Sequence, residues 1–119
     1  MSREVVYVRG EASIPVFATV GRTRFEQADE YGVIRRSEAR DFLIRAADLV
    51  VSGDVGGPEP VEDVSITPAA GDRIRERFGD VWHIYEVGPI PGEPAFRFSD
   101  PGRITLRIHT FHVGEEAAA

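Results

Sequence analysis

The sequence contains no cysteine, no lysine and no long apolar run. Without cysteine, the chain has no disulfide framework, no thiolate nucleophile and no cysteine-ligated zinc site. No stretch approaches the roughly 18 apolar residues of a membrane span, and the N-terminus has no apolar core of signal-peptide length. All 14 basic residues are arginine, a bias that a G- and C-rich genome explains more simply than interface chemistry does. We expect a soluble protein without an export signal.

The length and the net charge narrow the class of protein further. A chain of 119 residues is predicted to form a single domain, residues 1–119, that buries roughly two thirds of its unfolded surface. The net charge of −6 argues against binding nucleic acid by phosphate neutralisation, which needs a basic surface. A surface of the same sign as DNA can, however, let DNA pass without holding it.

The excess negative charge lies in one segment. Residues 46–72 contain no arginine, so all 14 basic residues lie outside them, together with an equal number of acidic ones. Glycine and proline are dense between residues 52 and 60, which predicts a long surface loop at about residues 46–63. Loops longer than about 12–15 residues tend to be functional or disordered. We therefore take its acidic residues as the candidate working part: Asp48, Asp54, Glu59, Glu62 and Asp63.

Alternating apolar residues predict an all-β fold, a small β-barrel or sandwich of short antiparallel strands with one long acidic loop insertion. Strands are expected at residues 5–8, 14–20, 22–27, 33–36, 37–44, 64–67, 72–78, 81–87, 96–98 and 104–113. Residues 37–47 are also compatible with a helix that begins at Ser37. The apolar parity changes at Phe111 and Val113, which indicates a bulge or a strand buried on both sides. Residues 114–119 are expected to form a flexible tail.

Neither catalysis nor metal binding is predicted, and no cofactor is expected. His109 and His112 are three apart in a predicted strand, so they should point to opposite faces. No serine has the sequence context of an activated nucleophile. Trp82, Tyr85, Phe96 and Phe98 could form a ligand-binding aromatic strip, although at strand spacing such residues are more often core.

Several segments resemble small head-completion proteins of tailed bacteriophages, also called stopper or head-tail joining proteins. The similar segments are residues 18–23 (ATVGRT), 38–44 (EARDFLI), 68–74 (PAAGDRI), 85–87 (YEV), 93–101 (EPAFRFSDP) and 106–110 (LRIHT). The pairing of FRFSD with RIHT is the most distinctive of these. The likeness covers nearly the entire chain.

The resemblance implies a small β-barrel that forms a closed ring in the neck of the virion, assembled in the host cytoplasm. Its partners would be further copies of itself, the portal adaptor and tail proteins. In such proteins a long loop projects into the central channel and helps retain packaged DNA until ejection, without sequence-specific binding. Two alternatives stay open: a tail terminator or minor tail protein, and a monomeric β-module that binds a small ligand or peptide through Trp82, Phe96 and Phe98.

A closed ring requires two different complementary patches on each subunit. The candidate patches are the arginine-rich strand face of Arg73, Arg75 and Arg77 and, separately, Arg35 and Arg36. They could meet carboxylates such as Glu26, Glu38 or Glu76 of a neighbour. Alternatively, they only keep exposed strand faces hydrated.

Overall fold

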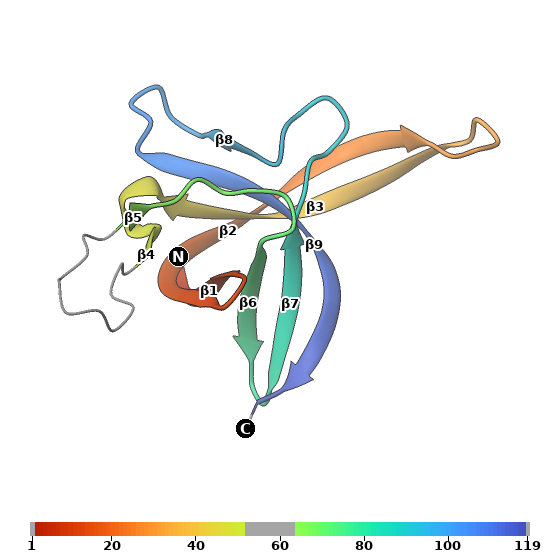
Figure 1. Ribbon diagram of the computed structural model, residues 1–119. Coiled ribbons are helices and arrows are strands. Elements are labelled where there is room, and N and C mark those ends of the chain that lie inside the picture. The colour runs from red at the N-terminus through yellow and green to blue at the C-terminus, as the bar shows by residue number, and fades with distance from the viewer. Residues whose placement is uncertain (1, 52–63, 119) are drawn as a thin grey trace, which may run out of the picture.

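The computed structural model describes residues 2–51 and 64–118, which form one large antiparallel sheet that curls into a ring (Figure 1). Its elements are β1 (Ser2–Arg9), β2 (Ala12–Ala28), β3 (Ile34–Arg45), the 3-10 turn η1 (Ala46–Asp48), β4 (Val50–Val51), β5 (Val64–Ser65), β6 (Arg73–Phe78), β7 (Val81–Val87), β8 (Phe96–Phe98) and β9 (Thr105–Ala117). The predicted all-β fold is confirmed. The alternative of a helix at residues 37–47 is wrong, because most of that segment belongs to β3.

The ring closes because β3 and β9 pair with each other. The strand order in the seven-stranded sheet is β3-β2-β1-β6-β7-β9-β8, and the additional β3–β9 pairing joins the two sides of the sheet. This pairing runs from Arg40↔Thr110 to Arg45↔Thr105. Strands β4 and β5 form a separate two-stranded sheet. Part of β9 therefore pairs with β3 and part with β7, which its 13 residues make possible.

The core lies inside this ring. Alternate residues of each strand face inward, as the period of two in the sequence requires. The buried apolar cluster comprises Val5, Tyr7, Val16, Ala18, Phe42, Ile44, Leu49, Ile74, Tyr85, Val87, Leu106 and Ile108. Leu49 follows η1 and is fully buried, so the chain is anchored in the core just before β4 begins.

Strands β2 and β3 continue beyond the ring as a two-stranded hairpin, which we call the arm (residues 23–39). Figure 1 shows the arm projecting away from the body. Gly32 has φ 77° in its turn, and the Asp29 carboxylate accepts hydrogen bonds from the N–H groups of Tyr31 and Val33 at 2.9 Å. A glycine in this turn can supply the positive φ that a hairpin requires, and Gly32 does so.

The C-terminal end of β9 pairs with β7, with a bulge between them. The register shifts between Ile84 and Tyr85, because Ile84 pairs with Gly114 and Tyr85 with His112. Val113 is the extra residue of this bulge, whereas Phe111 lies before it, so the bulge does not account for the parity of Phe111. The expectation of a flexible tail is wrong for Gly114–Ala117, which continue β9 as far as the Val81↔Ala117 pair.

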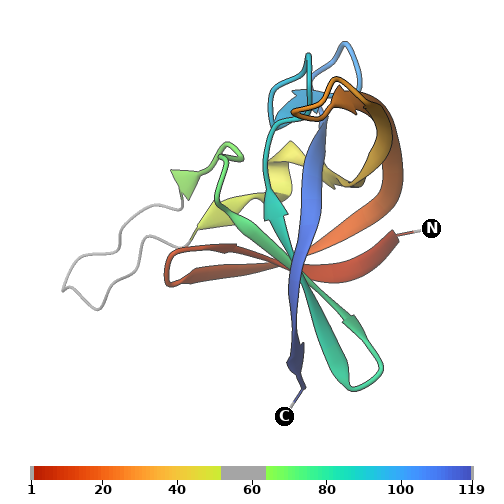
Figure 2. The same ribbon diagram turned by 90° about the vertical axis from the view of Figure 1, so that its right-hand side faces the viewer.

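The ends of the predicted loop carry regular structure. Ala46–Asp48 form η1, and Val50–Val51 pair with Val64–Ser65. Residues 52–63 lie outside the described part of the chain. Figure 2 shows the arm and β8 at one end of the molecule, with the β6–β7 hairpin and the C-terminus at the other. In residues 2–51 and 64–118, no helix is long and apolar enough to cross a membrane.

Candidate functional site

The acidic segment is joined to the curled sheet through the short β4–β5 pairing and the buried Leu49. Its flanks pair in the register Val50↔Ser65, and the Ile66 N–H donates to the Leu49 carbonyl at 2.9 Å. Asp48 lies in η1 and is exposed. The other predicted channel residues, Asp54, Glu59, Glu62 and Asp63, lie outside the described residues. Figure 1 places β4 and β5 on the side away from the tip of the arm.

Asp72, the last acidic residue of the arginine-free stretch, belongs to the body rather than to this segment. Its carboxylate is 7% exposed and accepts hydrogen bonds from the Tyr7 hydroxyl, the Arg9 guanidinium and the Ala69 N–H. Burial by itself would raise the pKa of Asp72, but these hydrogen bonds outweigh burial and hold the pKa below its usual range. Burial, followed by the hydrogen bond to Asp72, raises the pKa of Tyr7. The hydrogen bonds of Asp72 with Tyr7, Arg9 and Ala69 therefore connect β1 to the turn before β6.

The arm carries Arg35 and Arg36, and both meet carboxylates of their own chain. Arg36 lies 3.7 Å from Glu26, directly across the arm, and Arg35 lies 3.5 Å from Asp29. The Arg36 side chain is 90% exposed, so this pair contributes little to stability and leaves the guanidinium open to another partner.

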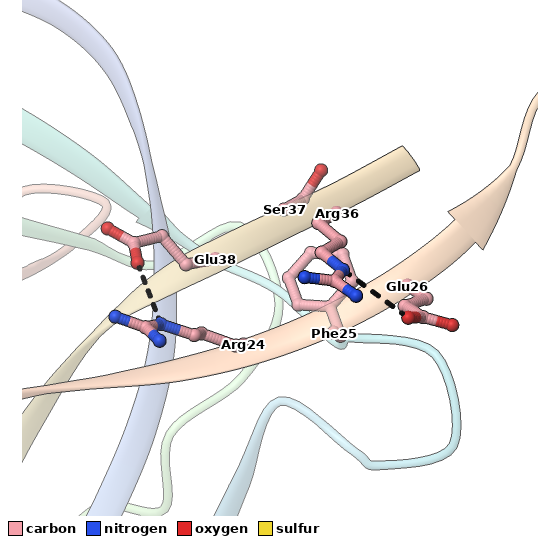
Figure 3. A pocket seen from close by; sticks show the side chains of 6 residues that line it. All are labelled: Arg24, Phe25, Glu26, Arg36, Ser37 and Glu38. Atoms are coloured by element: carbon pink, nitrogen blue, oxygen red, sulfur yellow. Dashed lines mark ion pairs between the residues drawn. The ribbon is translucent and has the colours of Figure 1, made fainter. Parts of the chain in front are cut away.

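A surface pocket of about 580 Å³ lies on the arm (Figure 3). It is lined by Arg24, Phe25, Glu26, Arg36, Ser37 and Glu38. Figure 3 shows two ion pairs that cross between the strands, Arg24 with Glu38 and Arg36 with Glu26. Because strand residues alternate, these charged groups share one face of the arm while Phe25 and Ser37 share the other. The charged face has both signs, which suits a polar protein partner better than DNA.

The second arginine group lies on β6, at the other end of the molecule. Arg73 lies 3.5 Å from Glu86 on β7, and Arg75 lies 3.2 Å from Glu116 on β9. Arg75 also lies over the Trp82 ring, 4.9 Å from its centroid. The Arg77 Nε donates to the Gly79 carbonyl at 2.8 Å. Arg73 and Arg77 are exposed and Arg75 is half-buried.

Glu76, between these arginines, is fully buried, which the sequence did not predict. Arg40 binds its carboxylate through Nε and a second guanidinium nitrogen, both at 3.0 Å, and Arg3 lies 2.9 Å away. Glu76 therefore links β6 to β1 and β3, and it is not available to a neighbouring subunit. Its partners are 36 and 73 residues away in the sequence, so no local pattern could reveal them.

The tip of the arm exposes apolar side chains, which the sequence analysis also missed. Tyr31, Val33 and Ile34 are 83%, 54% and 65% exposed. A cluster of this kind on a projecting hairpin is unusual for a surface that meets only water. The signal was present in the sequence as apolar residues on both sides of the turn glycine.

Two of the three histidines lie together and the third lies apart. His109 is fully buried and its Nδ1 lies 2.7 Å from Asp41. The hydroxyl of Thr23 donates to Asp41 rather than to the histidine, so the group lacks the order of a nucleophile, a base and an orienting acid. His112 instead approaches His83, at 3.2 Å between ring nitrogens. As predicted, His109 and His112 do not converge.

The four aromatic residues weighed as a ligand-binding strip do not form one surface. Tyr85 is buried in the core. Trp82 lies on the opposite face of β7, against Arg75. Phe96 and Phe98 are on β8 and pack partly buried against the core. This separation weakens the case for a monomeric ligand-binding module.

Comparison with known proteins gives one match. A family model described as phage head-tail joining protein matches residues 1–117. No curated protein and no solved structure matches the chain. The matched range takes in the whole curled sheet, both arginine groups and the acidic segment.

Proposed function

We propose a role for this chain from one premise: it belongs to the phage head-tail joining protein family, and is thus a structural component of the virion that connects head and tail. Beyond that connector role, we propose that it acts as a head-closure or stopper subunit. In this role several copies form a closed ring between the portal adaptor and the tail, and packaged DNA is retained by the ring and later passes through it. The observation that carries the proposal is the family match over residues 1–117, combined with the location of five of the six excess negative charges in one segment.

In this proposal the acidic segment faces the DNA path. Asp48, Asp54, Glu59, Glu62 and Asp63 would be repeated around the ring, which multiplies the local negative charge by the number of subunits. A collar of the same sign as DNA offers no sites to which phosphates can bind, so the polyanion can slide. The paired flanks support this placement, because β4 and β5 fix where the segment leaves and rejoins the body.

The arm and β6 would supply the two patches of the ring contact. A ring requires a heterologous contact, in which one surface of a subunit meets a different surface of the next. The arm, which carries Arg35 and Arg36, projects at one end, and β6, which carries Arg73, Arg75 and Arg77, lies toward the other (Figure 1). This separation suits a head-to-tail arrangement.

Deleting residues 52–60 tests the proposed function in assembled particles. The deletion spares both β4 and β5, so the curled sheet should still fold. We expect particles to assemble and then lose packaged DNA, measured as the DNA content of purified particles over time. A matched control replaces exposed carboxylates elsewhere, Glu4→Gln with Glu11→Gln, and should leave DNA content unchanged. Normal DNA retention by the deletion particles would contradict the proposal.

A further inference from the structure

The bulge in β9 brings three potential metal ligands to one face of the sheet. His83 and Tyr85 are two apart on β7, so they face the same side. Their partners on β9 are Glu115 and His112 respectively. Without the extra residue Val113, positions 112 and 115 would point to opposite faces. With it, both lie beside His83 where β7 and β9 run together (Figure 1).

The donor atoms have the spacing of a metal site. The His83 Nδ1 lies 3.2 Å from the His112 Nε2 and 3.6 Å from a Glu115 carboxylate oxygen. All three donors lie within 4.8 Å of one another. A tetrahedral zinc ion with ligands at 2.0–2.1 Å separates its donors by about 3.3 Å. The His83–His112 and His83–Glu115 distances are close to this donor–donor separation. The Glu115 side chain is exposed, so it has room to move nearer to His112.

Aromatic packing holds both imidazoles in place. The Phe78 ring lies edge-on to His83 at 5.2 Å between centroids, and the Tyr85 ring lies edge-on to His112 at 5.3 Å. The His83 side chain is only 26% exposed, whereas His112 and Glu115 are exposed. Packing therefore orients His83 most firmly, and the side of the cluster formed by His112 and Glu115 faces solvent. Such preorganisation is what a binding site needs.

We propose that His83, His112 and Glu115 bind one divalent transition-metal ion, Zn²⁺ in the first instance, with water at the fourth position. Two imidazoles and one carboxylate are ligands that zinc prefers, whereas Mg²⁺ and Ca²⁺ favour oxygen donors alone. The bound ion would join β7 to the C-terminal part of β9. This inference does not rest on the role in the neck, because the purified chain is sufficient to test it.

The test is a titration of the purified chain with zinc chloride, followed by calorimetry and by NMR of the imidazole groups. We expect one Zn²⁺ per chain, a higher melting temperature with zinc, and shifts of the His83 and His112 resonances. His109 is fully buried against Asp41 and serves as an internal control whose resonances stay in place. Absence of zinc binding, or a shift of His109 alone, would overturn the proposal.

Single substitutions locate the site. His83→Gln and His112→Gln should each abolish binding, and Glu115→Gln should weaken it at least about tenfold, since even outer-shell partners are worth 10–100-fold. The matched control is Glu116→Gln, because Glu116 lies opposite Trp82 on the other face and pairs with Arg75. This control should bind zinc as the unmodified chain does. Unchanged affinity in any of the three ligand variants would contradict the assignment.

Discussion

At the scale of single residues, Asp72 is the carboxylate whose ionisation matters most clearly to folding. Its pKa is lower in the folded chain than in the unfolded one, where it is about 3.9. The charged form is therefore favoured by folding, so its contribution is complete above that pH and is lost as the pH falls through the folded-state pKa. Asp72→Asn should destabilise the protein by about 1–3 kcal/mol near neutral pH. It should also reduce the loss of stability on acidification, measured by denaturant unfolding at several pH values.

A matched control for this carboxylate is Glu86→Gln. Glu86 pairs with Arg73 at 3.5 Å on the exposed side of β7, and such pairs contribute about 1 kcal/mol at most. We expect its stability at neutral pH to remain close to that of the unmodified chain. If Asp72→Asn and Glu86→Gln lost the same small amount of stability, the hydrogen bonds of Asp72 with Tyr7 and Arg9 would not stabilise the fold in the way proposed.

Glu76 provides a second test at this scale. Glu76→Gln keeps the shape of the side chain but leaves Arg3 and Arg40 without their shared counter-charge. These guanidinium groups are 39% and 27% exposed, so the expected loss is about 2–3 kcal/mol, below that of a fully buried pair. Thermal unfolding measures it. The control, Glu38→Gln, removes an exposed pair on the arm and should change stability by less than about 0.5 kcal/mol.

Individual residues also show where prediction from sequence stops. The exposure of Arg73 and Arg77 and the burial of Ile74 follow from the alternation along β6. Phe78 has the same parity as the buried Ile74 but is 40% exposed, because β6 ends there. The burial of Glu76 depends on Arg3 and Arg40, which only the closed ring brings to it. Alternation predicts the face on which a side chain lies but not the charges that it meets.

At the scale of elements, the arm is the part whose proposed role is most directly testable. Tyr31→Ser combined with Ile34→Ser replaces two apolar side chains at the tip of the arm and changes no residue of the curled sheet. We expect assembly into rings to be lost, as judged by light scattering, while the melting temperature of the chain stays the same. The substituted side chains are already exposed, so folding does not depend on burying them.

A control for the arm is Ile104→Ser, which removes a side chain that is 59% exposed outside the arm. It should leave ring assembly intact. Rings that form equally well in the arm variant and in this control would argue that the tip is not a subunit contact.

Turns and bulges were predictable to different degrees. The parity change near Val113 predicted a bulge as one of two possibilities, and the register confirms it. Pro101 and Gly102 have the residue types of a type II turn, in which the glycine would take the positive φ. In the structure the positive φ is instead on Arg103, at 58°. Local composition therefore indicates that the chain turns here, but not which residue takes the unusual angle.

At the scale of the whole molecule, the closure of the curled sheet within one chain is the feature that sequence patterns reveal least. Most strands could be recognised from their own alternation, although β2 and β3 were each predicted as two shorter strands and β4 was not predicted. The pairing of β3 with β9, in contrast, joins residues 60 to 70 positions apart. That pairing gives the molecule its curled shape and leaves the arm projecting. The convergence of His83, His112 and Glu115 has the same origin, because it needs both the β7–β9 register and its bulge.

The central claim is that a chain close to neutral outside one segment carries the acidic residues of that segment toward a channel. A reconstruction of the assembled virion neck at side-chain resolution tests it most directly. The account predicts a closed ring of this chain, with Asp48 and residues 52–63 facing the lumen through which DNA passes. A ring in which these residues lie on the outer surface of the particle, away from any lumen, would contradict it.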